Sequence, residues 1–146
     1  MDETAFREVL SEMVERPCAF EKALQTRCVG CSLAERVQIS EREAISCRTT
    51  ASLLRCTALH EHLRHNFSFA LKILPDATVL THAQEMRVQC GGLRGLQKVL
   101  EGNCEVTDVD GLLTSVLLKW DTLEDISYME VVHAAGECYK GRHEQP

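Results

Sequence analysis

The sequence predicts an all-α fold, a single compact domain of about five to seven helices over residues 1–146. Apolar residues recur at the three- and four-residue spacing of amphipathic helices in several segments. No segment shows a convincing alternation of period two, which a half-buried strand would show. The length of 146 residues and the 45% hydrophobic content suit one domain with its own core. A cysteine-bearing loop region is expected over 18–56, and helical hairpins over 76–141.

The N-terminal third is expected to begin with two helices. Apolar residues at helical spacing indicate the first helix, at Phe6, Val9, Leu10, Met13 and Val14. It should end near Arg16, because Pro17 fits the first turn of a second, short helix. Ser32 and Ser40 each precede a glutamate by three residues, a capping-box spacing that predicts short helical turns there. Residues 37–39, between these turns, could instead be extended.

Four further helices are expected after residue 48. One starts at Thr49 or Thr50 and runs to about Ile73, before Pro75. Another covers 82–100, and the Gly91-Gly92 pair in its middle predicts either a close backbone approach or a break. Asp108 is the expected N-cap of the next helix, and Ser127 that of the last, which should stop at Gly141.

Charge and hydropathy exclude several classes of protein. The formal net charge is -6 and no basic stripe is present, which argues against general nucleic-acid binding. The N-terminal segment is acidic without an apolar core, so we expect no signal peptide, and no apolar run is long enough for a membrane span. The sequence therefore predicts a cytoplasmic protein that acts with a protein partner, with its oligomeric state left open.

The eight cysteines are the main functional signal. Four follow the spacing C-x2-C-x15-C-x8-C, namely Cys28, Cys31, Cys47 and Cys56. Clustered cysteines in a reducing compartment favour metal, cluster or redox chemistry over disulfides. Iron–sulfur clusters are usually held by four thiolates at irregular spacing, whereas structural zinc commonly takes two close pairs or includes histidine. We therefore expect these four cysteines to bind an iron–sulfur cluster, 4Fe–4S in preference to 2Fe–2S, with zinc as the alternative.

Neighbouring residues could complete this site. Cys90 is an alternative ligand, because Gly91-Gly92 would let a cluster approach the backbone. Positive charges beside the cysteines would stabilise thiolates and an anionic cluster. The arginines in such positions are Arg27, Arg48 and Arg55, with Arg36 further along. His60, one turn after Cys56, could approach the same site.

Two other readings of the cysteines stay open. Cys28 and Cys31 could form an exchanging dithiol, although the preceding segment FEKALQTR does not resemble the strand found in thioredoxin-like folds. Cysteine is also a common small core residue, which suits Cys18, Cys90 and Cys138. Cys104, in the polar segment EGNCEVTD, is then the expected exposed and reactive thiol.

The stretch CVGCSLAERVQ resembles the cluster-binding opening of the iron–sulfur uracil-DNA glycosylases, in which a Cys-x-x-Cys precedes a leucine and an arginine. The resemblance covers about eleven residues. The catalytic and glycine-proline motifs of that family are absent, as is its αβα pattern, so the resemblance implies only that such a loop can ligate a cluster.

These observations predict a small iron–sulfur protein with a redox, electron-transfer or cluster-handling role. The first alternative is a helical protein–protein interaction module whose cysteines hold structural zinc or are buried without metal. The second is a thiol redox protein that uses Cys28 and Cys31. No phosphate-binding loop, nucleophile elbow or zinc-protease motif is present, so nothing in the sequence requires an enzyme.

Overall fold

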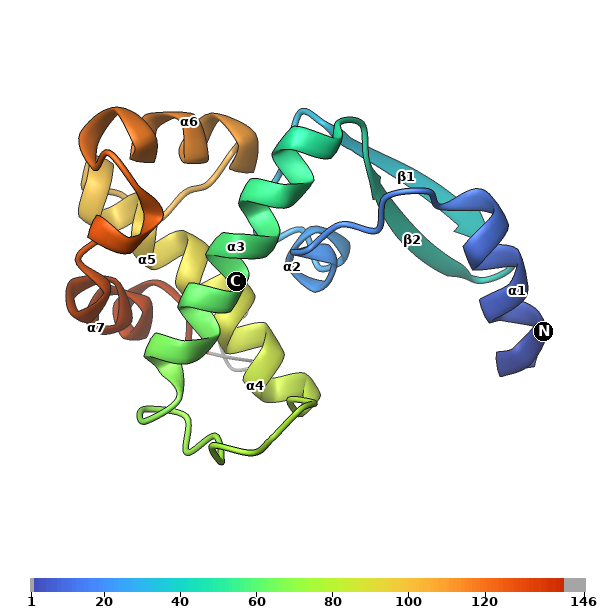
Figure 1. Cartoon of the computed structure of the whole chain (residues 1–146), viewed down its shortest axis with the longest axis horizontal. Helices are drawn as coiled ribbons and strands as arrows, with labels where there is room; N and C mark the ends of the chain where they lie inside the picture. Colours follow the sequence, from blue (N-terminus) through green and yellow to red (C-terminus); the bar gives the residue numbers. More distant parts are fainter. Residues whose placement is uncertain (1, 141–146) are drawn as a thin grey trace.

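The computed structural model describes residues 2–140, which form a mostly helical fold with one small antiparallel sheet (Figure 1). The predicted helical character is confirmed, but a strictly all-α fold is wrong. The elements in chain order are α1 (Glu3–Met13), α2 (Glu21–Gln25), β1 (Ala34–Ile39), β2 (Arg42–Cys47), α3 (Thr50–Phe67), α4 (His82–Met86), η1 (Arg87–Gly91), α5 (Gly92–Glu101), α6 (Val109–Lys119), η2 (Leu123–Asp125) and α7 (Tyr128–Cys138).

The sheet is a β-hairpin over the segment where the two capping boxes predicted helical turns, so that prediction is wrong. Ala34 pairs with Cys47 at one end of the hairpin and Ile39 with Arg42 at the other. Ser40 has a left-handed backbone, with φ of 58°, and opens the tight connection between the strands. Ala44, Ile45 and Ser46 are consecutive and all buried, so β2 is covered on both faces and carries no alternating pattern.

Helix α1 packs on this hairpin rather than on the main helical body. Asp2 caps the helix by accepting a hydrogen bond from the Ala5 amide at 2.7 Å. The two elements share a small separate apolar cluster, formed by Phe6, Val14, Ile39 and Ala44. Figure 1 shows α1 and the hairpin together at the right-hand end of the molecule, away from α5, α6 and α7.

The link between this end and the helical body differs from the sequence prediction. Pro17 does not open the second helix; it forms an isolated β-bridge with Ser46. The Cys18 amide donates to the Ile45 carbonyl at 3.0 Å, and the Cys47 amide donates to the Arg16 carbonyl at 2.8 Å. The chain around residues 16–18 therefore lies beside β2 before α2 begins at Glu21.

The helical body is built where α5 meets α3 and α7. A Cβ at Gly92 would lie 2.8 Å from Leu63 Cδ1, and a Cβ at Gly95 would lie 2.5 Å from the Val131 carbonyl oxygen. At the glycine pair the close neighbour is therefore the Leu63 side chain, and the close backbone approach lies at Gly95 instead. The helix predicted over 82–100 runs from α4 to α5 through the π-helical turn η1. Helix α3 ends at Phe67, earlier than the predicted Ile73.

The two C-terminal helices begin where predicted, although their first residues do not cap them as expected. Asp108 precedes α6 and Ser127 precedes α7, yet neither side chain makes a capping hydrogen bond. The predicted stop at Gly141 lies outside residues 2–140. Among the helices of that range, none combines the length and apolar character needed to cross a membrane.

Candidate functional site

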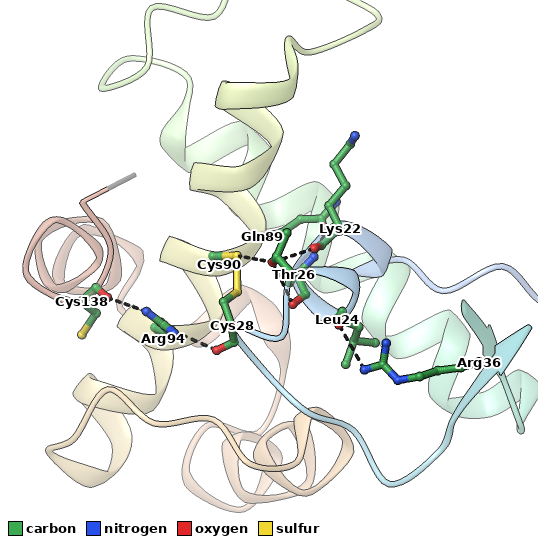
Figure 2. Close-up of a disulfide and its surroundings, with 10 residues drawn as sticks. Lys22, Leu24, Thr26, Cys28, Arg36, Gln89, Cys90, Arg94 and Cys138 are labelled. Carbon is green, nitrogen blue, oxygen red and sulfur yellow. Dashed lines mark hydrogen bonds between the residues drawn. A yellow bond between two sulfur atoms is a disulfide. The ribbon is translucent and has the colours of Figure 1, made fainter. Parts of the chain in front are cut away.

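The eight cysteines separate into two sets of four. Cys28 is disulfide-bonded to Cys90, and Cys104 to Cys138, with Cα–Cα distances of 6.1 and 5.5 Å. Figure 2 shows the first disulfide joining the loop after α2 to η1. The remaining cysteines are thiols, namely Cys18, Cys31, Cys47 and Cys56.

The predicted iron–sulfur cluster, and zinc as its alternative, are contradicted by this arrangement. Cys28, a predicted ligand, is bonded to Cys90, the proposed replacement ligand, so neither sulfur is free. Over residues 2–140, no group of three or more His, Cys, Asp or Glu side chains is placed to hold a metal ion. Cys104 was predicted to be a reactive thiol, and this is also wrong, because it is bonded to Cys138.

The four free cysteines line a single small pocket, which we call the thiol pocket. They come from different parts of the chain: the segment before α2, the loop before β1, the last residue of β2 and the second turn of α3. The apolar lining includes Phe20, Leu53 and Val109. The free volume is about 20 Å³, room for about one water molecule. Three of the four cysteines predicted as ligands, Cys31, Cys47 and Cys56, line this pocket. Cys28 does not, and Cys18 lies there instead.

Backbone groups fix the positions of three sulfurs. The Phe20 amide donates to Cys18 Sγ at 3.4 Å. The amides of Leu33 and Asp110 hydrogen-bond to the sulfur of Cys31. Cys47 instead donates from its Sγ to the Thr49 carbonyl at 3.2 Å, in a contact exposed to solvent. All four thiols are partly exposed, and Cys47 is the one whose hydrogen bond lies at the surface, so we place Cys47 at the rim of the pocket and call the other three the inner thiols.

Partial burial makes the inner thiols harder to ionise than ordinary thiols. Desolvation raises the pKa of Cys18 from 9.0 to about 12, and that of Cys56 to about 12. Negative charge on neighbouring sulfurs acts in the same direction for both. Burial also raises the pKa of Cys31, and the carboxylates of Asp108 and Asp110 add to that effect. These thiols resist ionisation unless the pocket opens or a partner removes the proton.

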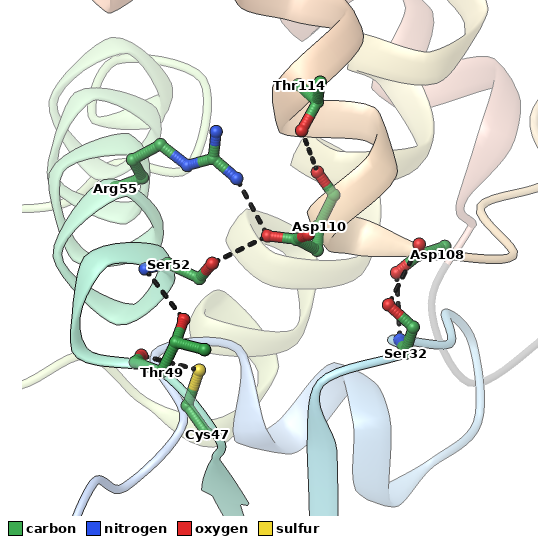
Figure 3. A network of polar contacts seen from close by, with 8 residues as sticks. All are labelled: Ser32, Cys47, Thr49, Ser52, Arg55, Asp108, Asp110 and Thr114. Atoms are coloured by element: carbon green, nitrogen blue, oxygen red, sulfur yellow. Dashed lines mark hydrogen bonds and ion pairs between the residues drawn. The ribbon is translucent and has the colours of Figure 1, made fainter.

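Two aspartates from the start of α6 join the pocket to the elements around it (Figure 3). Asp110 Oδ1 accepts from Ser52 Oγ at 2.8 Å and from Arg55 Nη2 at 2.8 Å, which ties α6 to α3. Asp108 Oδ1 accepts from the Ser32 amide at 2.9 Å, and Asp108 Oδ2 from Ser32 Oγ at 3.1 Å. The loop that carries Cys31 is thereby held against α6.

The other predicted site residues divide between this pocket and other surfaces. Arg55 borders the pocket through Asp110, and its charge lowers the pKa of Cys56, a smaller effect than desolvation. Arg48 pairs with Glu35 at 3.9 Å, and Arg27 lines a separate groove. His60 is directed to Glu85, and its Nε2 contacts the Glu85 carboxylate. Sequence reasoning missed Cys18, because the pairing of Pro17 with Ser46 gives no local signal.

The raised pKa values predict an unusual pH dependence of thiol alkylation. In the folded chain, iodoacetamide labelling of Cys18 and Cys56 should still be rising at pH 10, since their thiols titrate near 12. In the urea-unfolded chain the same labelling should level off above the ordinary pKa of 9.0. Peptide-resolved mass spectrometry reads each cysteine separately. Equal profiles in the folded and unfolded chains would show that the thiols are not buried.

The same raised pKa values predict that the folded protein becomes less stable in alkaline solution. The folded pKa values lie above the unfolded value of 9.0, so the folded state holds protons that the unfolded chain gives up. The free energy of unfolding should therefore fall as pH rises from 9 towards 12, and the contribution should be fully present below 9. Urea denaturation at pH 8 and pH 10 measures this loss.

No protein-family model, curated protein or solved structure gives a significant match to the chain.

Proposed function

We propose that this protein is a thiol–disulfide redox protein whose working site is the thiol pocket. The observation that supports this most is the convergence of all four free cysteines, from four separate parts of the chain, on one small apolar pocket. Cysteines that serve only as small core residues need not lie near one another. The two cysteines of a redox-active dithiol must lie close enough for their sulfurs to bond.

The reaction is an exchange with a disulfide carried by a partner protein. The thiolate of Cys47 attacks one sulfur of that disulfide, and the other partner sulfur leaves as a thiol. A second pocket thiol then attacks the mixed disulfide, forming a disulfide inside the pocket and releasing the second partner thiol. Two pocket thiols are oxidised and one partner disulfide is reduced, so atoms and electrons balance.

Cys47 is assigned the first step because of its position. Its hydrogen bond to Thr49 lies at the surface, whereas burial raises the pKa of Cys18, Cys31 and Cys56. Once the mixed disulfide forms on Cys47, the resolving thiol comes from the other three cysteines that line the same pocket. The dithiol of Cys28 and Cys31 that the sequence offered as an alternative plays no part here, because Cys28 is bonded to Cys90.

The predicted cytoplasmic location remains a prediction. The two disulfides of the fold weigh against it, because structural disulfides persist mainly in oxidising compartments. The partner protein expected from the sequence takes the role of the disulfide substrate.

The test is a redox titration of the full chain against mixtures of reduced and oxidised dithiothreitol, with thiols counted by maleimide mass tagging. We expect a reversible loss of two or four tags from the pocket cysteines. The Cys47→Ser variant should oxidise roughly tenfold more slowly. Ser11→Ala, at an exposed position on α1 outside the pocket, is the control and should oxidise at the rate of the unmodified chain. Pocket thiols that stay reduced throughout, or stoichiometric metal in the purified protein, would contradict the proposal.

An interaction module with metal-free cysteines is the second candidate, favoured by one observation. The connection between α3 and α4 exposes large apolar side chains, with Phe69 97%, Val79 83% and Leu74 68% exposed. On this reading the thiols only pack, so replacing Cys47 with serine would leave partner binding unchanged, whereas Phe69→Ser would weaken it.

A further inference from the structure

A second feature with cysteine chemistry lies apart from the thiol pocket. It is an open groove of about 870 Å³, which we call the disulfide groove, lined by Arg27, Cys28, Arg94, Cys104, Glu105 and Cys138 among others. Both disulfides contribute to its wall, and none of the four pocket thiols does. Its chemistry can therefore be separated from that of the thiol pocket.

The Cys104–Cys138 disulfide is the one that the groove presents. Both of its cysteines line the groove, whereas Cys90 of the other disulfide is fully buried and does not. Cys104 is partly exposed and Cys138 is only 3% exposed. An incoming thiol therefore meets Cys104 first, and Cys138 becomes the leaving group held inside the fold.

Positive charge is built into the groove between the two disulfides. Arg94 Nε donates to the Cys28 carbonyl at 3.0 Å, and Arg94 Nη1 donates to the Cys138 carbonyl at 3.2 Å (Figure 2). This places a guanidinium beside the backbone of the leaving cysteine. A cation there favours the thiolate that departs when the disulfide is cleaved.

Arg27 adds a second, exposed cation to the lining of the groove. Its backbone is left-handed, with φ of 63°, a conformation that non-glycine residues rarely adopt. Strain of this kind tends to collect at functional positions. Within residues 2–140 the Arg27 guanidinium makes no hydrogen bond or ion pair, so it is available to a ligand.

The remaining charges of the groove largely neutralise one another. Arg36 pairs with Glu43 at 2.7 Å, and Glu137 lies 3.6 Å from Lys98 and 3.6 Å from His133. Glu105 also lines the groove, and within residues 2–140 its carboxylate makes no ion pair.

We propose that the disulfide groove is a second exchange site, at which a small thiol that carries a carboxylate reduces the Cys104–Cys138 disulfide. The carboxylate binds Arg27 while the thiolate attacks Cys104 Sγ. The bond to Cys138 breaks, its electron pair leaves on Cys138 Sγ, and that sulfur takes up a proton from solvent. A second thiol molecule attacks the mixed disulfide on Cys104, giving the small disulfide and two protein thiols.

The experiment compares small thiols that differ in charge. The full chain is treated with mercaptopropionate, mercaptoethanol or cysteamine, and alkylation of Cys104 and Cys138 is followed by peptide mass spectrometry. Rates are expressed per thiolate. We expect the anionic reagent to react about tenfold faster than the cationic one, with the preference shrinking at high salt.

Variants of single arginines test whether Arg27 causes the preference for the anionic thiol. Arg27→Gln should remove most of the difference between the reagents, and Arg27→Lys should restore it. Arg7→Gln, an exposed arginine on α1, should leave the preference unchanged. Equal thiolate-corrected rates for the three reagents, or an equal preference in Arg27→Gln and Arg7→Gln, would overturn the proposal. Cys47→Ser should not affect these rates, so failure here is distinct from failure of the thiol-pocket proposal.

Discussion

Removal of the Cys28–Cys90 disulfide should lower the free energy of unfolding by about 4 kcal/mol. The two cysteines are 62 residues apart, so the bond excludes many conformations of the unfolded chain. The double variant Cys28→Ala/Cys90→Ala removes the bond without leaving an unpaired thiol. Urea denaturation followed by circular dichroism measures the loss.

The second disulfide gives the matched comparison. Cys104 and Cys138 are 34 residues apart, so Cys104→Ala/Cys138→Ala should cost about 0.5 kcal/mol less on chain-entropy grounds. Each double variant should also lose part of its sensitivity to phosphine reductants. A Cys28→Ala/Cys90→Ala chain as stable as the unmodified one would show that these two sulfurs are not bonded in the native protein.

Gly95→Ala should destabilise the protein by about 3 kcal/mol, the upper part of the range for overpacked cores. An added Cβ would lie 2.5 Å from the Val131 carbonyl oxygen and 2.9 Å from the Ala135 amide nitrogen. Both atoms belong to the backbone of α7, so the two helices must separate to relieve the contact. Thermal and urea denaturation would record the loss.

Gly136→Ala is the control for this prediction. Gly136 lies on the exposed side of α7, and a Cβ there would meet nothing within 4 Å. Alanine favours the helix over glycine by about 1 kcal/mol, so this variant should be slightly more stable than the unmodified chain. If Gly95→Ala gave the same stabilisation, the close packing of α5 on α7 would be disproved.

The helices were predictable because their signals are local. The apolar spacing of α3, α5, α6 and α7 indicated helices in these segments, and the glycine pair indicated close packing. The hairpin was not predictable in the same way. Its second strand is buried on both faces, so it lacks the alternation that identifies a strand from sequence.

The cysteine site was also only partly predictable from local sequence. Sequence spacing indicated that Cys31, Cys47 and Cys56 belong together, and the thiol pocket contains all three. Spacing does not determine disulfide connectivity, so the pairing of Cys28 with Cys90 could not be deduced. Cys18 enters the pocket because the segment around Pro17 pairs with β2, a long-range contact that no local motif encodes.

Disulfide mapping before and after mild oxidation tests the thiol pocket most directly. The native chain should show two disulfides, Cys28–Cys90 and Cys104–Cys138, with Cys18, Cys31, Cys47 and Cys56 open to alkylation after unfolding. After treatment with oxidised dithiothreitol, every new disulfide should join two of these four thiols. New bonds that link a pocket thiol to one of the other four cysteines, or Cys28 found as a free thiol in the native chain, would contradict the account.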